Sequence, residues 1–172
     1  VLSGNFTNRN TFTANTSRVV VVGSSTNATL DLGGSNLYAL RASTTAGGLV
    51  SFTDATVTIL DNLEIATGTV NIPTSLLRVG GSFLNTGGNF AHNNAEVRFT
   101  GNGTESIALL GTTFLNHFYD VSFTGSGNWT FLDTNATTTN TWTQSNGNIT
   151  FPSGQLTIGR DFTTSGGSFA AN

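Results

Sequence analysis

Cysteine and methionine are absent from this sequence, and only two of its 172 residues are proline. Because there is no cysteine, the fold has no disulfide bonds, and cysteine usage does not indicate a cellular compartment. Charged residues are also scarce, at 9% of the chain, and the net charge is −3. A chain with so few cations lacks the basic patch that binds nucleic acid or an anionic membrane surface. No apolar run reaches the ~18 residues that a membrane-spanning helix needs.

The residues that are abundant favour β-strands. Thirteen phenylalanines accompany many valine, isoleucine and threonine residues, and 37% of the chain is hydrophobic. Segments of alternating apolar and polar residues recur roughly every 8–12 residues, separated by clusters of glycine, asparagine, aspartate and serine. No linker or charged run interrupts them. The pattern therefore predicts one all-β domain that spans residues 1–172.

A repeated motif runs through this domain. Residues 77–93 (LRVGGSFLNTGGNFAHN) return at residues 156–172 as LTIGRDFTTSGGSFAAN, at a spacing of 79 residues. A looser copy, VLSGNFTNRNTFTAN, begins the chain. We therefore expect two copies of about 79 residues, over residues 1–76 and 77–155, and the start of a third over residues 156–172.

A tandem repeat of this length predicts a stacked array of short elements. With strand-like patterns, the expected fold is a parallel β-helix, or β-solenoid, with three short strands and about 20–26 residues in each of about seven turns. If the repeat equals a whole number of turns, the matching residues Phe83 and Phe162 lie in the same sheet. Stacked phenylalanines are expected to form the core. The candidates are Phe6, Phe12, Phe83, Phe90, Phe99, Phe162 and Phe169.

Three runs in the second copy carry a family resemblance: L-x-V-G-G-S-F-x-N-x-G from residue 77, A-E-V-R-F-x-G from residue 95 and F-Y-D-V-S-F from residue 118. They resemble the repeats of large bacterial secreted or cell-surface proteins of the adhesin, filamentous-haemagglutinin or autotransporter-passenger kind. The resemblance covers nearly the whole chain. It implies a β-solenoid stalk at the cell surface, and it brings no catalytic residue with it.

Composition and the two ends of the sequence lead to the same functional expectation. A surface solvated by threonine, serine and asparagine, with little lysine or glutamate, is typical of secreted repeat proteins, so we expect an extracellular location. Both ends carry core motifs without a capping element, and such turns present unpaired backbone groups and an apolar cross-section. We expect a fibre, filament or adhesive stalk. Its partner would be another copy of the chain or further repeats of a longer chain, with surface glycans as a further candidate.

The alternative function is a carbohydrate-binding or polysaccharide-degrading β-helix. A binding module would hold its ligand through exposed aromatic side chains, and Trp129 and Trp142 are the candidates, although burial is the simpler expectation for both. An enzyme would need several acids to converge in one groove with Arg98 or Arg160. No such constellation is visible in the sequence. We therefore expect no enzymatic activity, no cofactor and no metal.

The remaining candidate residues have structural interpretations. His92 and His117 have no metal-ligand spacing, and we expect them to face solvent. Asp54 and Asp133 each lie two residues after a strand phenylalanine, and we interpret them as turn residues that accept hydrogen bonds from their own backbone. In a secreted protein, asparagines in Asn-x-Ser/Thr sequons are candidates for N-glycosylation. They are Asn5, Asn15, Asn27, Asn102, Asn128, Asn135 and Asn148.

Overall fold

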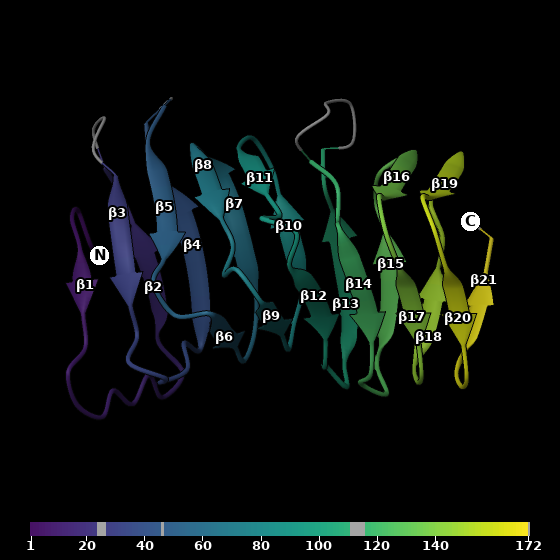
Figure 1. Ribbon diagram of the computed structural model, residues 1–172, viewed down its shortest axis with the longest axis horizontal. Coiled ribbons are helices and arrows are strands. Elements are labelled where there is room, and N and C mark those ends of the chain that lie inside the picture. Colours follow the sequence, from purple (N-terminus) through teal and green to yellow (C-terminus); the bar gives the residue numbers. More distant parts are fainter. Residues whose placement is uncertain (24–26, 46, 111–115, 172) are drawn as a thin grey trace.

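The protein is a parallel β-solenoid. The computed structural model describes residues 1–23, 27–45, 47–110 and 116–171, and within these ranges it has 21 strands and no helix. The strands pair in parallel with strands of the neighbouring turns, so they stack along one axis (Figure 1). Three strands make one turn, and the longest sheet has eight strands, which corresponds to about eight turns. The fold class predicted from the sequence is therefore confirmed.

Four sheets form the three sides of this solenoid. The two-stranded sheet takes the same place in the order of each turn as the five-stranded sheet. The five-stranded sheet consists of β1 (Phe6–Thr7), β3 (Ala28–Asp31), β5 (Leu49–Phe52), β8 (Thr69–Asn71) and β11 (Asn89–Ala91), and the two-stranded sheet of β16 (Asn135–Thr138) and β19 (Gln155–Ile158). The eight-stranded sheet consists of β2 (Arg18–Val21), β4 (Ala39–Ser43), β7 (Leu63–Thr67), β10 (Phe83–Asn85), β13 (Thr104–Ala108), β15 (Asn128–Phe131), β18 (Asn148–Thr150) and β21 (Ser168–Ala170). The six-stranded sheet consists of β6 (Thr56–Ile59), β9 (Leu76–Val79), β12 (Glu96–Phe99), β14 (Asp120–Phe123), β17 (Trp142–Gln144) and β20 (Phe162–Thr164).

A turn takes about 20 residues over much of the chain. Leu63 pairs with Phe83 in this way, one turn further along. The next turn is longer, because Phe83 pairs with Ile107, and the bonded residues Asn85 and Leu109 beside this pair are 24 residues apart. The expected range of turn lengths is therefore confirmed, and each turn advances the chain by about 4.8 Å, the spacing between neighbouring strands.

The core follows from the alternation of residues along each strand. Successive side chains point to opposite faces of a sheet, so the three sides, which enclose one narrow interior, bury every second residue. Phe99 and Phe123 stack in successive turns with ring centroids 5.0 Å apart, and Trp142 follows at 4.9 Å from Phe123. Each aromatic contact of this kind adds about 0.5–1.5 kcal/mol beyond the burial of its area. The aromatic residues therefore link one turn to the next through the interior.

The spacing of the sequence repeat is not a period of the structure. Leu77 and Phe162 belong to one column of residues in the six-stranded sheet, four turns apart. Phe83, which matches Phe162 in sequence, lies in β10 of the eight-stranded sheet. Our expectation that these two phenylalanines share a sheet is therefore wrong. Residue 172, the last of the third sequence copy, lies outside the described residues.

The two copies of the motif lie on different sides of the solenoid because every side requires the same pattern of residues. Each side needs an alternating strand, and each corner needs a compact turn. Asn85, at the end of a strand in the eight-stranded sheet, donates from Nδ2 to the carbonyls of Gly88 and of Leu109 one turn later. Gln144 makes the corresponding two bonds in the six-stranded sheet, with the Gly147 carbonyl and with the Ser168 carbonyl one turn later. One motif therefore fits any side, and its recurrence does not report the length of a turn.

Stacked glycines mark one corner of the solenoid. Gly80, Gly101 and Gly125 follow one another in successive turns, at the ends of β9, β12 and β14. A Cβ atom at Gly101 would lie 2.3 Å from the carbonyl oxygen of Gly80, and one at Gly125 would lie 2.0 Å from the carbonyl oxygen of Gly101. The backbones of neighbouring turns therefore come too close here for any side chain.

Candidate functional site

The two tryptophans proposed as ligand-facing residues are fully buried. Trp129 and Trp142 are each 0% exposed. They lie at inward positions of β15 and β17, where the alternation of the strand directs them into the aromatic core. Neither can meet a ligand at the surface, so this candidate role is corrected. Large aromatic side chains fill the core, which in each turn is enclosed by only three strands.

The candidate core phenylalanines occupy three environments. Phe83, Phe90 and Phe99 are fully buried. Phe6 and Phe12 are partly buried, pack against the core and contact each other edge to face, with ring centroids 5.3 Å apart. The last two, Phe162 and Phe169, are 43% and 51% exposed. They occupy the final described turn, where no later turn covers them.

All seven sequon asparagines lie at exposed positions. Several already bind a neighbouring turn through the side-chain amide. Asn148 donates from Nδ2 to Oδ1 of Asn128 at 2.8 Å, and its own Oδ1 accepts a bond from the Ser168 hydroxyl at 2.6 Å. Asn5 and Asn135 accept backbone N–H bonds from the following turn. Exposure permits glycan attachment, while these contacts give the same asparagines a structural role.

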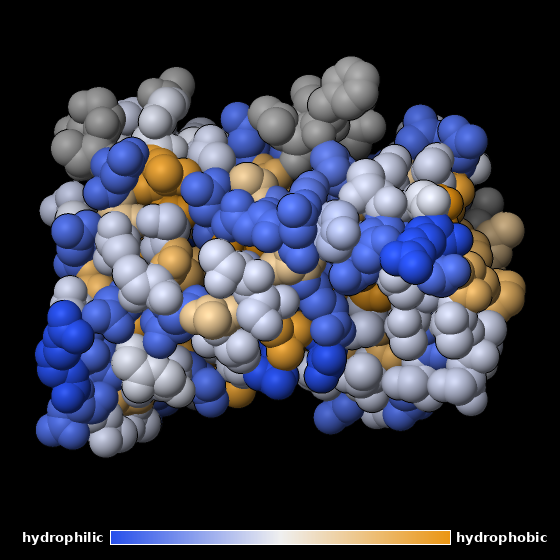
Figure 2. Space-filling view, in the orientation of Figure 1, coloured by the Kyte–Doolittle hydropathy of each residue, from blue (hydrophilic) through white to orange (hydrophobic). Residues whose placement is uncertain are grey.

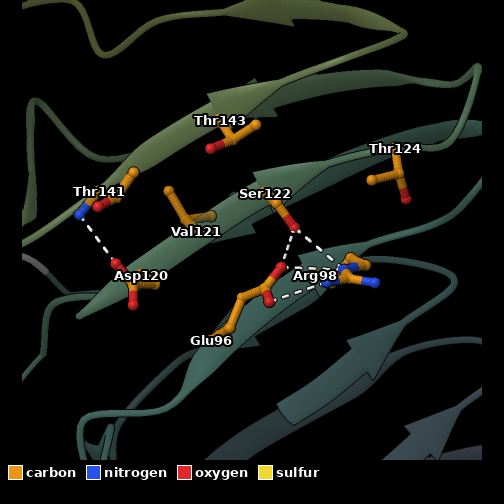
Figure 3. Close-up of a pocket in the computed structure, with 8 residues that line it drawn as sticks. All are labelled: Glu96, Arg98, Asp120, Val121, Ser122, Thr124, Thr141 and Thr143. Atoms are coloured by element: carbon orange, nitrogen blue, oxygen red, sulfur yellow. Dashed lines mark hydrogen bonds and ion pairs between the residues drawn. The ribbon is translucent and has the colours of Figure 1, made fainter. Parts of the chain in front are cut away.

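A polar hollow lies on the six-stranded sheet (Figure 3). It encloses about 500 Å³ and opens to solvent. Residues of successive turns line it because outward positions of neighbouring strands stand side by side. They are Glu96, Arg98, Asp120, Val121, Ser122, Thr124, Thr141 and Thr143. We call this the sheet hollow.

An ion pair forms the centre of the sheet hollow. Arg98 donates from Nε and Nη2 to the two carboxylate oxygens of Glu96, each at 2.9 Å. The Ser122 hydroxyl donates to Glu96 and accepts a bond from Arg98 Nε at 3.3 Å. Partial burial acts to raise the pKa of Glu96, but the bonds from Arg98 and Ser122, with the charges of Arg98 and Arg78, hold it below 4.5. Glu96 is therefore ionised at neutral pH.

The second carboxylate of the sheet hollow is that of Asp120, which lies in β14, one turn after Glu96. Its Oδ1 accepts bonds from the Thr141 N–H at 2.9 Å and from Nδ2 of Asn140 at 2.8 Å. The structure thus brings two acids together with Arg98, whereas Arg160 lies in the last turn and pairs with the neighbouring Asp161. A glycosidic general acid needs a raised pKa. The lowered pKa of Glu96 suits the acceptance of hydrogen bonds and not the donation of a proton.

The threonine-rich segment of residues 134–143, beside the sheet hollow, does not place its threonines in one flat array on a single sheet. Thr137 lies in β16 of the two-stranded sheet, and Thr143 lies in β17 of the six-stranded sheet. A corner therefore separates them. On the six-stranded sheet, Thr143 is next to Thr163 and Ser122 and not in a column of threonines alone.

A second hollow, of about 390 Å³, lies where the six-stranded and eight-stranded sheets meet. It contains Glu64, which forms ion pairs with Arg41 at 3.2 Å and with Arg18 at 3.7 Å. Arg18 and Arg41 are themselves in successive turns, so Glu64 links three turns. These are partly exposed pairs, and each adds about 0–1 kcal/mol. They join three neighbouring turns at the surface.

The two histidines meet although 25 residues separate them in the sequence. His92 follows β11 and His117 precedes β14 one turn later, and their Nε2 atoms are 3.0 Å apart. Both histidines are partly exposed, as expected for residues that face solvent, but the contact between them was not expected. The sequence contains no signal for this contact, because it depends on the length of the intervening turn.

Asp54 and Asp133 also act between turns. Asp54 accepts bonds from the backbone N–H groups of Leu32 at 2.6 Å and Gly34 at 3.0 Å, both in the preceding turn. Asp133 accepts a bond from the Leu109 N–H at 2.6 Å. The interpretation that each aspartate bonds its own backbone is therefore corrected. Their recurrence reflects the same bond to the preceding turn.

Among the described residues, no group of three or more histidine, cysteine, aspartate or glutamate side chains is placed to hold a metal ion. The same residues contain no helix that could cross a membrane. Comparison with protein-family models, with curated proteins and with solved structures returned no match.

Proposed function

We propose that this chain is a structural segment of an extracellular β-solenoid, which serves as a fibre or an adhesive stalk on a cell surface. In this proposal its end turns are covered by further β-solenoid turns, from another copy or from further repeats of a longer polypeptide. The resemblance of its motifs to bacterial surface repeats supports the location. The proposal assigns the function to length and self-association.

The observation that carries this proposal is the exposed last turn. Trp142 and Ile149 are 0% and 1% exposed, whereas Phe162 and Phe169, one turn later in the same two columns, are 43% and 51% exposed. Figure 2 shows hydrophobic residues gathered at the C-terminal end of the molecule. Among the described residues, each strand of this turn, β19, β20 and β21, pairs with another strand along one edge only. A further turn in parallel register would bury the rings and pair the backbone.

The isolated 172-residue chain tests the proposal. We expect light scattering to show concentration-dependent assembly and negative-stain images to show filaments of uniform width. The double variant Phe162→Asp with Phe169→Asp places charges on the exposed cross-section and should abolish assembly. Thr163→Asp is the matched control, because Thr163 lies in the same strand but at an outward position. A wild-type monomer that persists at all concentrations, with protected amides in β19, β20 and β21, would contradict the proposal.

The sheet hollow supports a second candidate, which is glycan binding. It combines an ionised carboxylate, a guanidinium group and several hydroxyl groups on one face, the donor and acceptor set that sugar hydroxyls require. No exposed aromatic platform accompanies it among its lining residues, since the tryptophans are buried. For this reason we place glycan binding second.

A panel of neutral and acidic oligosaccharides tests this second candidate by calorimetry. Arg98→Ala should abolish binding of any sugar that occupies the sheet hollow, while Arg160→Ala, in the last turn, should leave it unchanged. Absence of binding across the panel would remove the candidate. Specific cleavage of any polysaccharide would contradict the structural proposal and favour an enzyme.

A further inference from the structure

His92 and His117 form a contact between two successive turns, outside the sheet hollow. Their ring centroids are 4.7 Å apart, and the ring of Tyr119 stacks on His92 at 5.5 Å with an interplanar angle of 21°. The Nε2 atoms of the two histidines are 3.0 Å apart, the distance of a hydrogen bond. One histidine must therefore donate a proton to the other.

The backbone shows which histidine is the donor. The N–H of Asn94 donates to Nδ1 of His92 at 2.9 Å. A nitrogen that accepts a hydrogen bond carries no proton, so the proton of neutral His92 lies on Nε2. His92 then donates from Nε2 to Nε2 of His117, and the proton of neutral His117 lies on Nδ1. This assignment follows from the hydrogen bonds.

We propose that the His92–His117 pair is an acid-sensitive latch that joins two neighbouring turns of the solenoid. Both nitrogens that could accept a further proton are already engaged as acceptors. A proton on Nε2 of His117 would face the Nε2–H of His92, and a proton on Nδ1 of His92 would face the N–H of Asn94. Uptake of one proton therefore breaks one of the two hydrogen bonds, and uptake of two places like charges side by side.

The backbone around His92 has little freedom to adapt. Asn93 and Asn94 have φ angles of 50° and 56°, in the left-handed region. Asn93 also donates from Nδ2 to the Ile72 carbonyl at 2.6 Å, and the Ala95 N–H donates to the His92 carbonyl at 2.8 Å. The bond from Asn93 holds this segment against the preceding turn of the solenoid, and the bond from Ala95 closes the segment on itself. Protonation should thus separate the turn from His117 and not shift it smoothly.

In the part of the chain that the structure describes, no carboxylate forms an ion pair or hydrogen bond with His92 that would offset the added charge. The titratable side chains in contact with His92 are His117 and Tyr119. The nearest acids along the chain, Glu96 in β12 and Asp120 in β14, bind Arg98 and the segment of residues 140–141, respectively. Burial, and then the charge of His117, lower the pKa of His92 below 6.5.

The lowered pKa of His92 sets the direction of the pH effect. The unfolded or opened chain takes up a proton more readily than the closed one, so the closed form loses stability as the pH falls below 6.5. Above 6.5 the latch stays closed. Phe90 and Phe118, whose rings are 5.8 Å apart in the core, flank the two histidines in sequence, so opening would loosen the aromatic column at this point.

Nitrogen-15 NMR of the imidazoles tests the latch directly, because the chain has only two histidines. At neutral pH we expect His92 as the Nε2–H tautomer and His117 as the Nδ1–H tautomer. As the pH falls below 6.5, the protection factors of the amides at residues 90–95 and 116–119, which compare each observed rate with its intrinsic rate at the same pH, should fall by up to roughly tenfold per pH unit. Amides of β7 and β8, away from the pair, should not respond.

Variants separate the latch from ordinary acid sensitivity. In His117→Gln the amide oxygen still accepts the bond from His92 but cannot take up a proton, so the pKa of His92 should rise while staying below 6.5. The double variant His92→Gln with His117→Gln should lose the acid-dependent fall in protection at both segments. An Nδ1–H tautomer for His92, protection factors in wild type that do not depend on pH, or an acid response that persists in the double variant would each overturn the proposal.

Discussion

Gly101→Ala offers a sharp test of how closely the turns stack. The new Cβ atom would lie 2.3 Å from the carbonyl oxygen of Gly80 and 3.1 Å from its carbonyl carbon. Neither atom can easily move, because the Gly80 N–H donates to the Ile59 carbonyl at 2.9 Å and the Thr100 N–H donates to the Val79 carbonyl at 2.9 Å. A shift large enough to remove the clash would break bonds of the six-stranded sheet.

The expected loss of stability lies in the range found for overpacked interiors, about 1–3 kcal/mol. For a chain of this size, that loss corresponds to a fall in Tm of about 2–12 °C. Gly103→Ala is the matched control, because its Cβ atom would meet only the end of the flexible Glu105 side chain, at 2.6 Å from Oε1. Neither glycine has a positive φ. Replacement at Gly103 should therefore be neutral or slightly stabilising, since alanine restricts the unfolded chain.

Thermal unfolding followed by circular dichroism, with urea unfolding in parallel, measures both variants. Equal stability of Gly101→Ala and Gly103→Ala would show that neighbouring turns are further apart at this corner than the structure has them. The stacking geometry would then need revision.

Three further predictions concern the core and the ion pair. Trp142→Ala should lower the free energy of unfolding by about 3–5 kcal/mol in urea, whereas Trp142→Phe should cost less, because the Trp142 indole N–H has no hydrogen-bond partner among the described residues. Asn85→Ala leaves buried backbone groups such as the Leu109 carbonyl without their bond and should cost about 1–3 kcal/mol in the same assay. The lowered pKa of Glu96 means that its stabilising effect is present above pH 4.5 and is lost as the pH falls further. Tm measured across the acid range from neutral pH should therefore fall more steeply for wild type than for Glu96→Gln, and equal slopes would contradict the assignment.

The fold was predictable because alternation and turn residues are local signals. The inward position of Phe83 and the outward position of Arg98 follow from the alternation of side chains along a strand. The register of the turns could not be predicted. The match between residues 77–93 and 156–172 reflects the strand and turn residues that every side and corner require, and it does not give the number of turns between the two copies. For this reason Phe162, predicted to share a sheet with Phe83, lies in a different sheet.

The candidate sites depend on register, which the sequence does not display. Glu96 stands beside Asp120, and His92 beside His117, because the steps between them take 24 and 25 residues. A turn of about 20 residues, as over much of the chain, would place other residues together. The burial of Trp142 was open for the same reason, since a tryptophan is equally compatible with a core and with a surface until its column is known.

Disulfide cross-linking tests end-to-end association most directly, because the chain has no cysteine of its own. Thr7 in β1 and Thr157 in β19 are exposed residues at the two ends of one side of the solenoid. They lie some seven strand spacings apart, roughly 34 Å, so no bond can form within one chain. If the last turn of one copy pairs in parallel with the first turn of the next, oxidised Thr7→Cys with Thr157→Cys should give a ladder of covalent multimers. The control Thr7→Cys with Thr163→Cys, on different sides, should not give a ladder. The experiment uses concentrations at which light scattering shows the wild-type chain to assemble. A Thr7→Cys with Thr157→Cys variant that stays monomeric on a non-reducing gel under these conditions would contradict end-to-end association.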